Sequence, residues 1–338
     1  METPTCELVL TNTHMKTKCS VKKTESSQYE ISYQPTDRGR HQLHIKVECE
    51  HIKGSPFPVT VKLPVQKLGT PSKTISGVRR PWGVAVNQRG DIVVVENGEC
   101  CVSIFSPAGE KLQSFGSQGS SHGQFNNPQG VAVDSEDNIL VVDSDNSNIQ
   151  KFTSNGKFIT AVGNQGDKHL DFNKPAGIGI HPNNKEIYVA DTFNHCIRIL
   201  NPDLTFSSSF GSRGRDNGQF VSPCDVAFDS TGNVYVLEFG NNRIQVFTAA
   251  VQFMRKFGSQ GKGNGELNYP MGISIDSDNV VYVTEDGNNR VSVFTCEGEF
   301  LSSFGSKGSG PGQFNEPRGI TVDKSGMIIV SDNHLQFF

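Results

Sequence analysis

The chain has 338 residues, with 31 lysines and arginines against 35 aspartates and glutamates, and a formal net charge of −4. This length allows two ordinary domains or one large all-β domain with a small companion, and the charge excludes a protein that coats nucleic acid over its whole surface. Only 35% of the residues are hydrophobic while 35 are glycine, which disfavours long helices and favours short strands joined by glycine turns.

The first 64 residues contain short segments in which apolar and polar side chains alternate. Tyr29–Pro35, Gly39–Val47 and His51–Phe57 show this pattern between turn residues, which is typical of strands in a β-sandwich. We expect about five strands here, starting near Glu7–Leu10, whereas an immunoglobulin-like sandwich has about seven strands in about 100 residues. The sequence therefore predicts that residues 1–64 form a partial immunoglobulin-like β-sandwich that starts in the middle of its domain.

From residue 65 onward a four-residue phrase occurs six times at intervals of 47 or 48 residues. It consists of proline, any residue, glycine or aspartate, and an aliphatic residue. Each interval contains four alternating segments separated by polar turns, which is the size of one blade of a β-propeller. The sequence therefore predicts an all-β chain whose residues 65–338 form a six-bladed propeller. The blades are expected to start near Pro81, Pro128, Pro175, Pro223, Pro270 and Pro317.

The ring closure is also predictable. Val65–Gly69 matches the last strand of a repeat although no earlier repeat precedes it, and the repeat that starts at Pro317 stops at Phe338 within its third strand. We expect Val65–Gly69 to supply the fourth strand of that blade and to close the ring, because a strand shared between the two chain ends hides two sheet edges.

The turn after the second strand of each repeat carries an asparagine-rich phrase. Glu238–Arg243 and Glu285–Arg290, with the variants Asp191–Cys196 and Asp332–Leu335, resemble the NHL repeat, named for Asn-His-Leu. The phrases between Tyr29 and Phe57 resemble the carboxyl-terminal half of a filamin-type repeat. A filamin-type repeat followed by six NHL repeats is similar to the carboxyl-terminal half of tripartite-motif NHL (TRIM-NHL) proteins, whose amino-terminal half carries a RING finger, B-boxes and a coiled coil.

The resemblance implies a substrate- or partner-recognition module of an E3 ubiquitin-protein ligase, which acts in ubiquitin-dependent protein degradation with protein substrates or adaptors as partners. RING and B-box modules need paired zinc ligands, and the eight cysteines of this chain lack that spacing. We therefore expect no catalytic residue, cofactor or metal site on this chain. The alternative that the resemblance implies is an RNA-binding post-transcriptional repressor, which binds single-stranded or hairpin RNA.

A hydrolase with a metal in the propeller channel is a third hypothesis, which requires several acids or histidines on the inner strands. Those strands offer only Asp225, where the other five repeats have glycine, and a solvated or turn-bonded aspartate is the simpler interpretation. Met1–Lys23 is polar and no apolar run is long enough to cross a bilayer. We therefore expect a cytoplasmic protein without a membrane or a small-molecule partner.

Strand alternation places the connectors between repeats and the asparagine-rich turns on one face of the propeller, the long-loop face, where we expect a partner to bind. Trp82 beside two arginines suits RNA bases and phosphates, or it packs between blades. Glu238 with Arg243, and Glu285 with Arg290, are spaced to form ion pairs across a turn. The candidate binding residues are Arg79, Arg80, Trp82, Arg213, Arg215, Arg243, Lys262, Arg290 and Arg318.

The same turns also bring acids to the predicted face, so that basic sectors are expected only near Arg79–Trp82 and Arg213–Arg215. Because of these acids, the sequence predicts a face of mixed charge. The acids are Glu96, Glu99, Asp143, Asp145, Asp191, Glu238, Glu285, Asp286 and Asp332.

Overall fold

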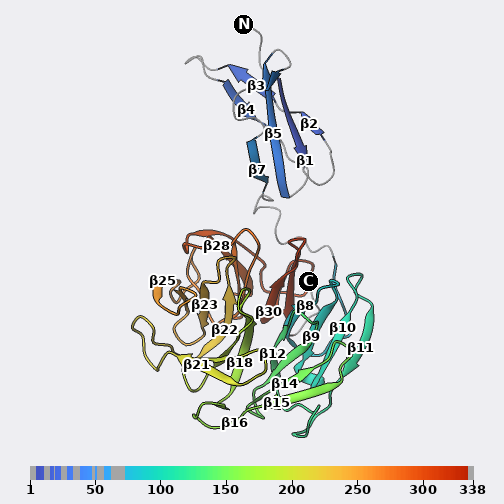
Figure 1. Ribbon diagram of the computed structural model, residues 1–338, viewed down its shortest axis with the longest axis vertical. Coiled ribbons are helices and arrows are strands. Elements are labelled where there is room, and N and C mark those ends of the chain that lie inside the picture. The colour runs from blue at the N-terminus through green and yellow to red at the C-terminus, as the bar shows by residue number, and fades with distance from the viewer. Residues whose placement is uncertain are drawn as a thin grey trace. The chain divides into compact units, whose positions relative to one another are not determined.

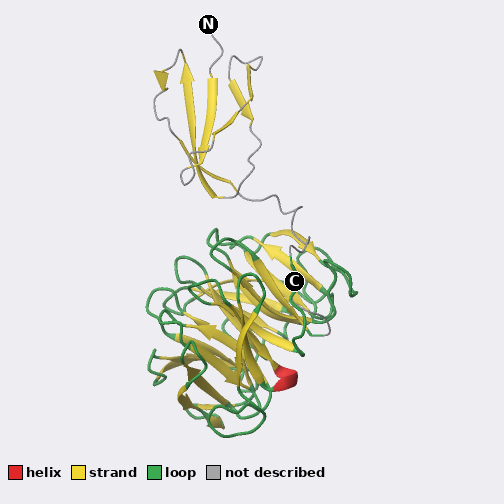
Figure 2. Ribbon diagram, turned by 90° about the vertical axis from the view of Figure 1, so that its right-hand side faces the viewer, coloured by secondary structure: helices red, strands yellow, loops and turns green. Residues whose placement is uncertain are grey.

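The computed structural model describes seven strands between residues 5 and 61 and the whole of residues 73–333 (Figure 1). The chain divides into two compact units, Met1–Leu68 and Gly69–Phe338. Within the described residues, strands and loops make up almost the whole chain, and the one helical element is a 3-10 turn at Asn97–Glu99, drawn in red in Figure 2. No helix among these residues is long and apolar enough to cross a membrane.

The first unit has two sheets. β5 is the central strand of the larger sheet and pairs antiparallel with β1, β6 and β7, while β2 pairs with β1, and β3 and β4 form a separate hairpin. The prediction of about five strands was too low, because β2 and β6 are too short to show an alternating pattern. The strands are β1 (Thr5–Leu10), β2 (Lys16–Lys18), β3 (Ser20–Lys23), β4 (Tyr29–Ser32), β5 (Gly39–Val47), β6 (Glu50–His51) and β7 (Phe57–Val61).

In residues 73–333 the second unit contains five four-stranded antiparallel blades, a two-stranded antiparallel sheet that starts at the sixth proline, and a short two-stranded parallel sheet in one connector. The first three blades are β8 (Pro81–Val86), β9 (Ile92–Glu96), β10 (Cys101–Phe105) and β11 (Lys111–Phe115); β12 (Pro128–Val133), β13 (Ile139–Asp143), β14 (Asn148–Phe152) and β15 (Phe158–Val162); and β18 (Pro175–Ile180), β19 (Ile187–Asp191), β20 (Cys196–Leu200) and β21 (Phe206–Phe210).

The remaining sheets follow the same order along the chain. They are β22 (Pro223–Phe228), β23 (Val234–Glu238), β24 (Arg243–Phe247) and β25 (Phe253–Phe257); β26 (Pro270–Ile275), β27 (Val281–Glu285), β28 (Arg290–Phe294) and β29 (Phe300–Phe304); and the two-stranded sheet of β30 (Pro317–Val322) and β31 (Ile328–Asp332). A short parallel pair, β16 (Asn164–Gln165) and β17 (Asp171–Phe172), lies in the connector before β18.

The innermost strands form a closed ring in the order β8, β12, β18, β22, β26, β30, and β30 packs against β8 (Figure 1). Each of the six predicted prolines begins one of these strands. The prediction of six four-stranded blades is corrected to five such blades, because the sheet that starts at Pro317 has two strands in the described part of the chain. Val65–Gly69, the predicted closing strand, lies outside the described residues.

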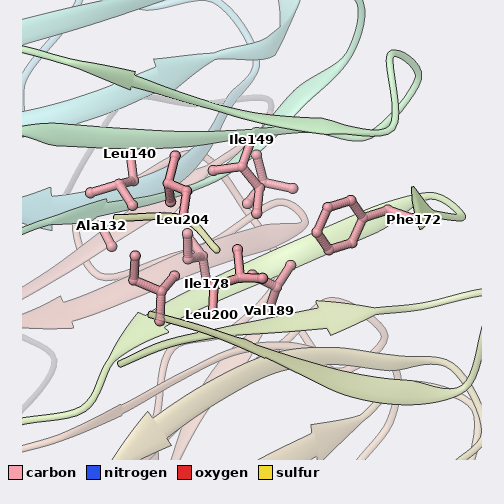
Figure 3. Packing of buried hydrophobic residues seen from close by; sticks show 10 residues of the cluster. Ala132, Leu140, Ile149, Phe172, Ile178, Val189, Leu200 and Leu204 are labelled. Carbon is pink, nitrogen blue, oxygen red and sulfur yellow. The ribbon is translucent and has the colours of Figure 1, made fainter. Parts of the chain in front are cut away.

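The blades pack face to face through apolar side chains. Every residue of β13 is buried, whereas β11, an outermost strand, is mostly exposed, because only the inner strands are covered by a neighbouring blade on each side. Figure 3 shows Leu140 and Ile149 of the second blade packed against Val189 and Leu200 of the third.

Each connector inserts one large apolar side chain into this packing. Phe220, for example, is fully buried. It lies against the Phe-Gly pair that ends the preceding strand and recurs in other repeats. Gly211 of this pair has φ of +97°, and a Cβ on it would lie 2.4 Å from the Phe220 ring. Glycine alone tolerates both that conformation and that approach. The inserted side chains are Phe125, Phe172, Phe220, Leu267 and Phe314.

Candidate functional site

Connectors and asparagine-rich turns lie on the same face, because hydrogen bonds join them. The acid that ends the second strand of each sheet accepts a backbone N–H located two residues before the proline that starts the same sheet, as Glu238 Oε2 does from Val221 N at 3.0 Å. This contact anchors the connector to the turn. It occurs six times, from Arg79 to Glu96, Asn126 to Asp143, Asn173 to Asp191, Val221 to Glu238, Asn268 to Glu285 and Asn315 to Asp332.

The asparagine of the repeat phrase completes this anchor. Asn241 Nδ2 donates to Glu238 and also to the backbone carbonyl of Gly214 in the connector. One amide thereby bridges the buried acid and the loop above it. Asn146, Asn194 and Asn288 make the same pair of contacts in their blades.

These anchors correct the predicted charge of the long-loop face. Six of the acids assigned to it are at most 2% exposed, and burial raises the pKa of Asp143 and Asp191 above the usual carboxyl value although backbone N–H groups oppose the rise. Because these six acids are buried, they add little negative charge to the solvent-facing surface, which is therefore more basic than the sequence predicted. The buried acids are Glu96, Asp143, Asp191, Glu238, Glu285 and Asp332.

The two predicted ion pairs are present. Arg243 Nε lies 2.5 Å from Glu238 Oε1, and Arg290 Nε lies 2.7 Å from Glu285 Oε1. Arg243 is only 8% exposed, and its guanidinium also donates to the backbone carbonyls of Arg215 and Gln219. These two arginines therefore hold connectors in place, and as candidate binding residues they remain a prediction.

The third blade contains a related pair that the spacing rule missed. Arg198 Nε lies 3.1 Å from Asp191 Oδ2, and its guanidinium donates to the carbonyl of Asp167 in the connector. Arg198 lies two positions further along its strand than Arg243 does in β24. A search for arginine on the same side of the third strand would have found it.

Trp82 is partly buried at the rim of the channel. The guanidinium carbon of Arg318 lies 4.7 Å from its ring centre, and Arg318 also pairs with Asp286 at 3.2 Å and Glu316 at 3.0 Å. The side chain of Arg318 is only 13% exposed. This candidate binding residue therefore forms its ion pairs within the propeller. The cation on Trp82 comes from β30 and not from the adjacent arginines that the sequence suggested.

The remaining candidates are exposed. Arg79 pairs with Glu99 at 3.2 Å in a solvent-facing contact, while Arg80 lies beside it. Arg213 and Arg215 belong to the connector between the third and fourth blades, on the far side of the ring from Trp82. The structure therefore does not bring Arg79, Arg80 and Arg215 together around Trp82. The exposed cations of this face are Arg79, Arg80, Lys168, Arg213, Arg215, Lys262 and Lys307.

Exposed aromatic rings on the third to fifth blades were not predicted. Phe193 is 58% exposed and Tyr269 is 47% exposed, and the Tyr269 ring stacks on Phe239 at 5.1 Å between centroids. We refer to Phe193, Phe239 and Tyr269, together with Arg213 of the connector between the third and fourth blades, as the aromatic sector. Phe193 and Phe239 stand inside the asparagine-rich turns, so their places in the repeat phrase were the available signal.

His195 links this sector to the repeat framework. Its Nδ1 accepts the backbone N–H of Ser222 at 3.1 Å, which fixes the connector above it. Burial, followed by the positive charge of Arg213, lowers the pKa of His195 below its usual value. The imidazole is therefore held neutral as an acceptor.

The residue before each blade-starting proline has an unusual backbone conformation. Its φ lies between +46° and +81° in all six copies, a left-handed conformation that is uncommon for residues other than glycine. Its backbone groups are tied to the asparagine-rich turns, as when Asp286 N donates to the carbonyl of Tyr269. The six residues are Arg80, Asn127, Lys174, Ser222, Tyr269 and Glu316.

Asp225 lies in the central channel, as the third hypothesis requires, but its contacts are to backbone. Its Oδ1 accepts from Val226 N and its Oδ2 from Ile273 N of the next blade, both at 2.9 Å. No second acid and no histidine lines the channel cavity beside it among the described residues. The converging ligand set needed for a channel metal is therefore not found in residues 73–333.

Family models and relatives agree with this architecture. A Filamin/ABP280 repeat model matches residues 2–58, an NHL repeat model matches residues 78–105, 125–152, 172–200 and 220–247, and a 6-bladed beta-propeller model matches residues 277–336. The E3 ubiquitin-protein ligases TRIM71 of Rattus norvegicus and Bos taurus are 37% identical to the chain over 98 residues. That match covers 26% of this chain but only 12% and 11% of the two relatives.

Solved structures with a similar fold include enzymes. A streptogramin B lyase has a TM-score of 0.56 at 15% identity, with 99% of this chain and 96% of that chain covered. A gluconolactonase from Xanthomonas campestris has a TM-score of 0.59 at 14% identity, with 80% and 90% covered. At these identities the likeness shows the fold alone. The chain thus contains a filamin repeat followed by NHL repeats, and over 26% of its length it is similar to the TRIM71 relatives.

Proposed function

We propose that this chain is the non-catalytic recognition part of a TRIM-NHL type E3 ubiquitin-protein ligase, and that it docks protein substrates or adaptors on the long-loop face for ubiquitin-dependent degradation in the cytoplasm. The observation that supports it most is the aromatic sector. Exposed aromatic rings beside arginine are the side chains that most often anchor protein interfaces. The name of the TRIM71 relatives supports the ligase context.

The charge of the face supports a partner with an acidic and apolar surface. The buried acids cannot repel such a partner, while Arg213, Arg215 and Lys262 are exposed and form no ion pair among the described residues. In protein complexes, charges at the rim of the interface mainly steer association and select partners, and aromatic rings that become buried on binding supply most of the affinity. The proposal therefore assigns affinity to Phe193 and Tyr269 and selectivity to the cations.

The test is a comparison of matched surface variants of the full chain in cross-linking and co-purification from cells. Phe193→Ala combined with Tyr269→Ala should lose its protein partners by at least roughly tenfold, with partner cross-links of the wild type concentrated on Lys262 and Lys168. Leu112→Ala removes an equally exposed apolar side chain from the outer strand β11, 54% exposed, and should keep the partners. Equal retention by both variants would refute docking at the aromatic sector.

The alternative function, RNA-binding repression, is favoured by one observation. Exposed cations outnumber exposed acids on this face, and the stacked Tyr269 and Phe239 rings offer a platform of the kind that single-stranded bases use. A salt titration against a random single-stranded RNA pool separates the two functions, with Arg79→Ala and Arg80→Ala together as the test variant. Sequence-selected binding that weakens with salt and in the variant would favour RNA. Absence of selection would leave protein docking.

We also propose that Val65–Gly69 adds a strand to the sheet of β30 and β31, so that the propeller has six blades. The closed ring of six innermost strands supports this, because a two-stranded sheet would leave β31 with an uncovered edge. Amide hydrogen exchange of the full chain tests it. Slow exchange at Val65–Gly69 is expected, and exchange at the rate of an unstructured peptide would contradict it.

A further inference from the structure

The centre of the ring encloses a cavity of about 310 Å³, which is lined by the six innermost strands. Most lining residues are glycine, alanine, valine and isoleucine, and the others include Trp82, Phe228, Met271, Ser274 and Thr321. Among the described residues the ionisable side chains of the lining are Asp225 and the thiol of Cys224. Polar atoms make up more of the channel surface than apolar atoms, although Asp225 is its single carboxylate among the described residues, and the fold does not need this carboxylate. Five of the six strands have glycine where β22 has Asp225, namely Gly83, Gly130, Gly177, Gly272 and Gly319.

The neighbouring strand makes room for this carboxylate. A Cβ on Gly177 would lie 2.3 Å from Asp225 Oδ1, so the glycine of the third blade allows the acid of the fourth to turn toward it. Two backbone N–H groups, of Val226 and Ile273, occupy one acceptor site on each oxygen. A carboxylate has about four such sites, so about two remain for a ligand.

No cation neutralises Asp225 within the described residues. The adjacent strands β18 and β26 carry no titratable side chain, and β22 itself adds only Cys224, whose pKa is raised by burial and by Asp225. The strand β19, which also packs against β22, adds Tyr188 and Asp191, and Asp191 is paired with Arg198. On β23, the strand paired with β22, the titratable groups are Tyr235 and Glu238, and Glu238 is paired with Arg243. Burial raises the pKa of Asp225 to about 7 although both N–H groups oppose the rise.

At the rim the available charge is already used. Arg318 is the cation of the adjacent strand β30, and its guanidinium is held by the Trp82 ring, Asp286 and Glu316. Within the described residues the carboxylate in the channel thus lacks a counter-charge, while aliphatic side chains and polar backbone groups surround it. An ionised group buried in this way is stabilised most by one oppositely charged partner that also fills the apolar space.

We propose that the channel is a binding site for an alkylammonium group, with the ammonium donating to Asp225 and the alkyl stem lying along the aliphatic walls. A primary ammonium has three donors and a hydrophobic stem, as in the lysine side chain. Two sources share this chemistry: a free alkylamine, and a lysine side chain presented by a protein partner. No residue of the aromatic sector lines the channel cavity. The proposed site can therefore be tested independently of the proposed docking function.

The test is titration of the full chain with n-butylammonium chloride, followed by isothermal calorimetry and by the fluorescence of Trp82, the only tryptophan of the chain and a residue of the cavity lining. With a carboxyl pKa of about 7, the ionised fraction is about 0.1 at pH 6 and about 0.9 at pH 8, so affinity should rise roughly tenfold between these pH values. The neutral isostere 1-butanol should bind weakly and without this pH dependence.

Asp225→Gly is the decisive variant, because it restores the residue of the other five strands and should therefore fold. It should lose at least roughly tenfold in affinity for butylammonium together with the pH dependence, and Asp225→Asn should do the same. Circular dichroism confirms that both variants fold. Unchanged binding by Asp225→Gly, equal binding of 1-butanol, or no heat and no fluorescence change at millimolar amine would overturn the proposal.

Two further arms separate the sources of the ammonium. A blocked Gly-Gly-Lys-Gly-Gly peptide that competes with butylammonium, when its acetyl-lysine analogue does not, assigns the site to a partner's lysine. Competition by free amines alone assigns it to a small alkylamine. The combined Phe193→Ala and Tyr269→Ala variant should bind butylammonium as the wild type does, which distinguishes failure at the channel from failure of docking at the face.

Discussion

The Arg318 guanidinium lies over the Trp82 ring, with 4.7 Å between the guanidinium carbon and the ring centre. Arg318 belongs to β30 and Trp82 to β8, so this contact joins the last described sheet to the first blade. The same seam contains a hydrogen bond from Ser331 Oγ to the carbonyl of Trp82. Trp82 therefore takes part in closing the ring.

Arg318→Ala should destabilise the propeller by about 1–3 kcal/mol, because it removes the cation–π contact and leaves Asp286 and Glu316 without this cation. Chemical denaturation measures the change, and Trp82 fluorescence should shift in the native state. Arg89→Ala is the control, since Arg89 pairs with Asp91 while 64% of its side chain is exposed, and it should cost at most about 1 kcal/mol. Equal losses in both variants would contradict a special role for the seam.

Glu238→Ala should cost about 3–5 kcal/mol, because it removes one partner of a buried ion pair and frees the Val221 N–H of the connector. Faster hydrogen exchange at residues 213–222 should accompany the loss, which locates the effect in the connector. Asp145→Ala removes a half-exposed acid that pairs with Lys174 at 3.0 Å and should cost no more than about 1 kcal/mol. A similar small loss in Glu238→Ala would show that the anchor contributes little.

Gly130→Ala should destabilise the ring by at least about 2 kcal/mol, because the added Cβ would meet the backbone carbonyl oxygen of Ala176 at 2.3 Å. Backbone of the neighbouring blade cannot move without shifting its whole strand. In Gly263→Ala the nearest atom is a Glu266 carboxylate oxygen at 3.0 Å, which can rotate away, so the melting temperature should barely change. A mild effect of Gly130→Ala would mean that the channel spacing is adjustable.

The stability of the wild type should fall as pH rises from 5 to 8 by an amount that Asp225→Asn removes. The pKa of Asp225 is about 7 in the folded chain against an ordinary 3.8, so its stabilising contribution is full below pH 3.8 and is lost as pH rises toward 7. Relative to the wild type, the free energy of unfolding of the variant should rise by about 1–2 kcal/mol across this range. This is less than the full pKa shift would give, because solvent in the channel screens the charge. Parallel pH profiles for the two proteins would disprove the raised pKa.

The repeat predicted most of the propeller because its physical causes recur every 47 or 48 residues. Each proline begins an inner strand, and the Glu238–Arg243 and Glu285–Arg290 spacings correctly indicated ion pairs. The five four-stranded blades follow from alternation alone. What alternation cannot show is the direction of a side chain at a strand end, where the pattern stops.

That limit explains the errors at the candidate site. Glu96 and Asp143 stand at strand ends next to polar turns, so they resemble surface acids, yet connector N–H groups turn them inward. Trp82 is next to Arg80 in the sequence, but its cation comes from Arg318 at the other end of the ring. Contacts that depend on ring closure have no local signal in the sequence.

The left-handed residue before each proline gives the propeller six equivalent display positions. Its backbone is fixed by the following proline and by the turn beside it, so the identity of its side chain does not determine the fold at that point. The chain places an arginine, a lysine, an acid, an aromatic ring and two small polar groups there, spaced one per sheet around the channel. Substitutions at these six positions should therefore change the chemistry of the long-loop face without any insertion or any change in loop length.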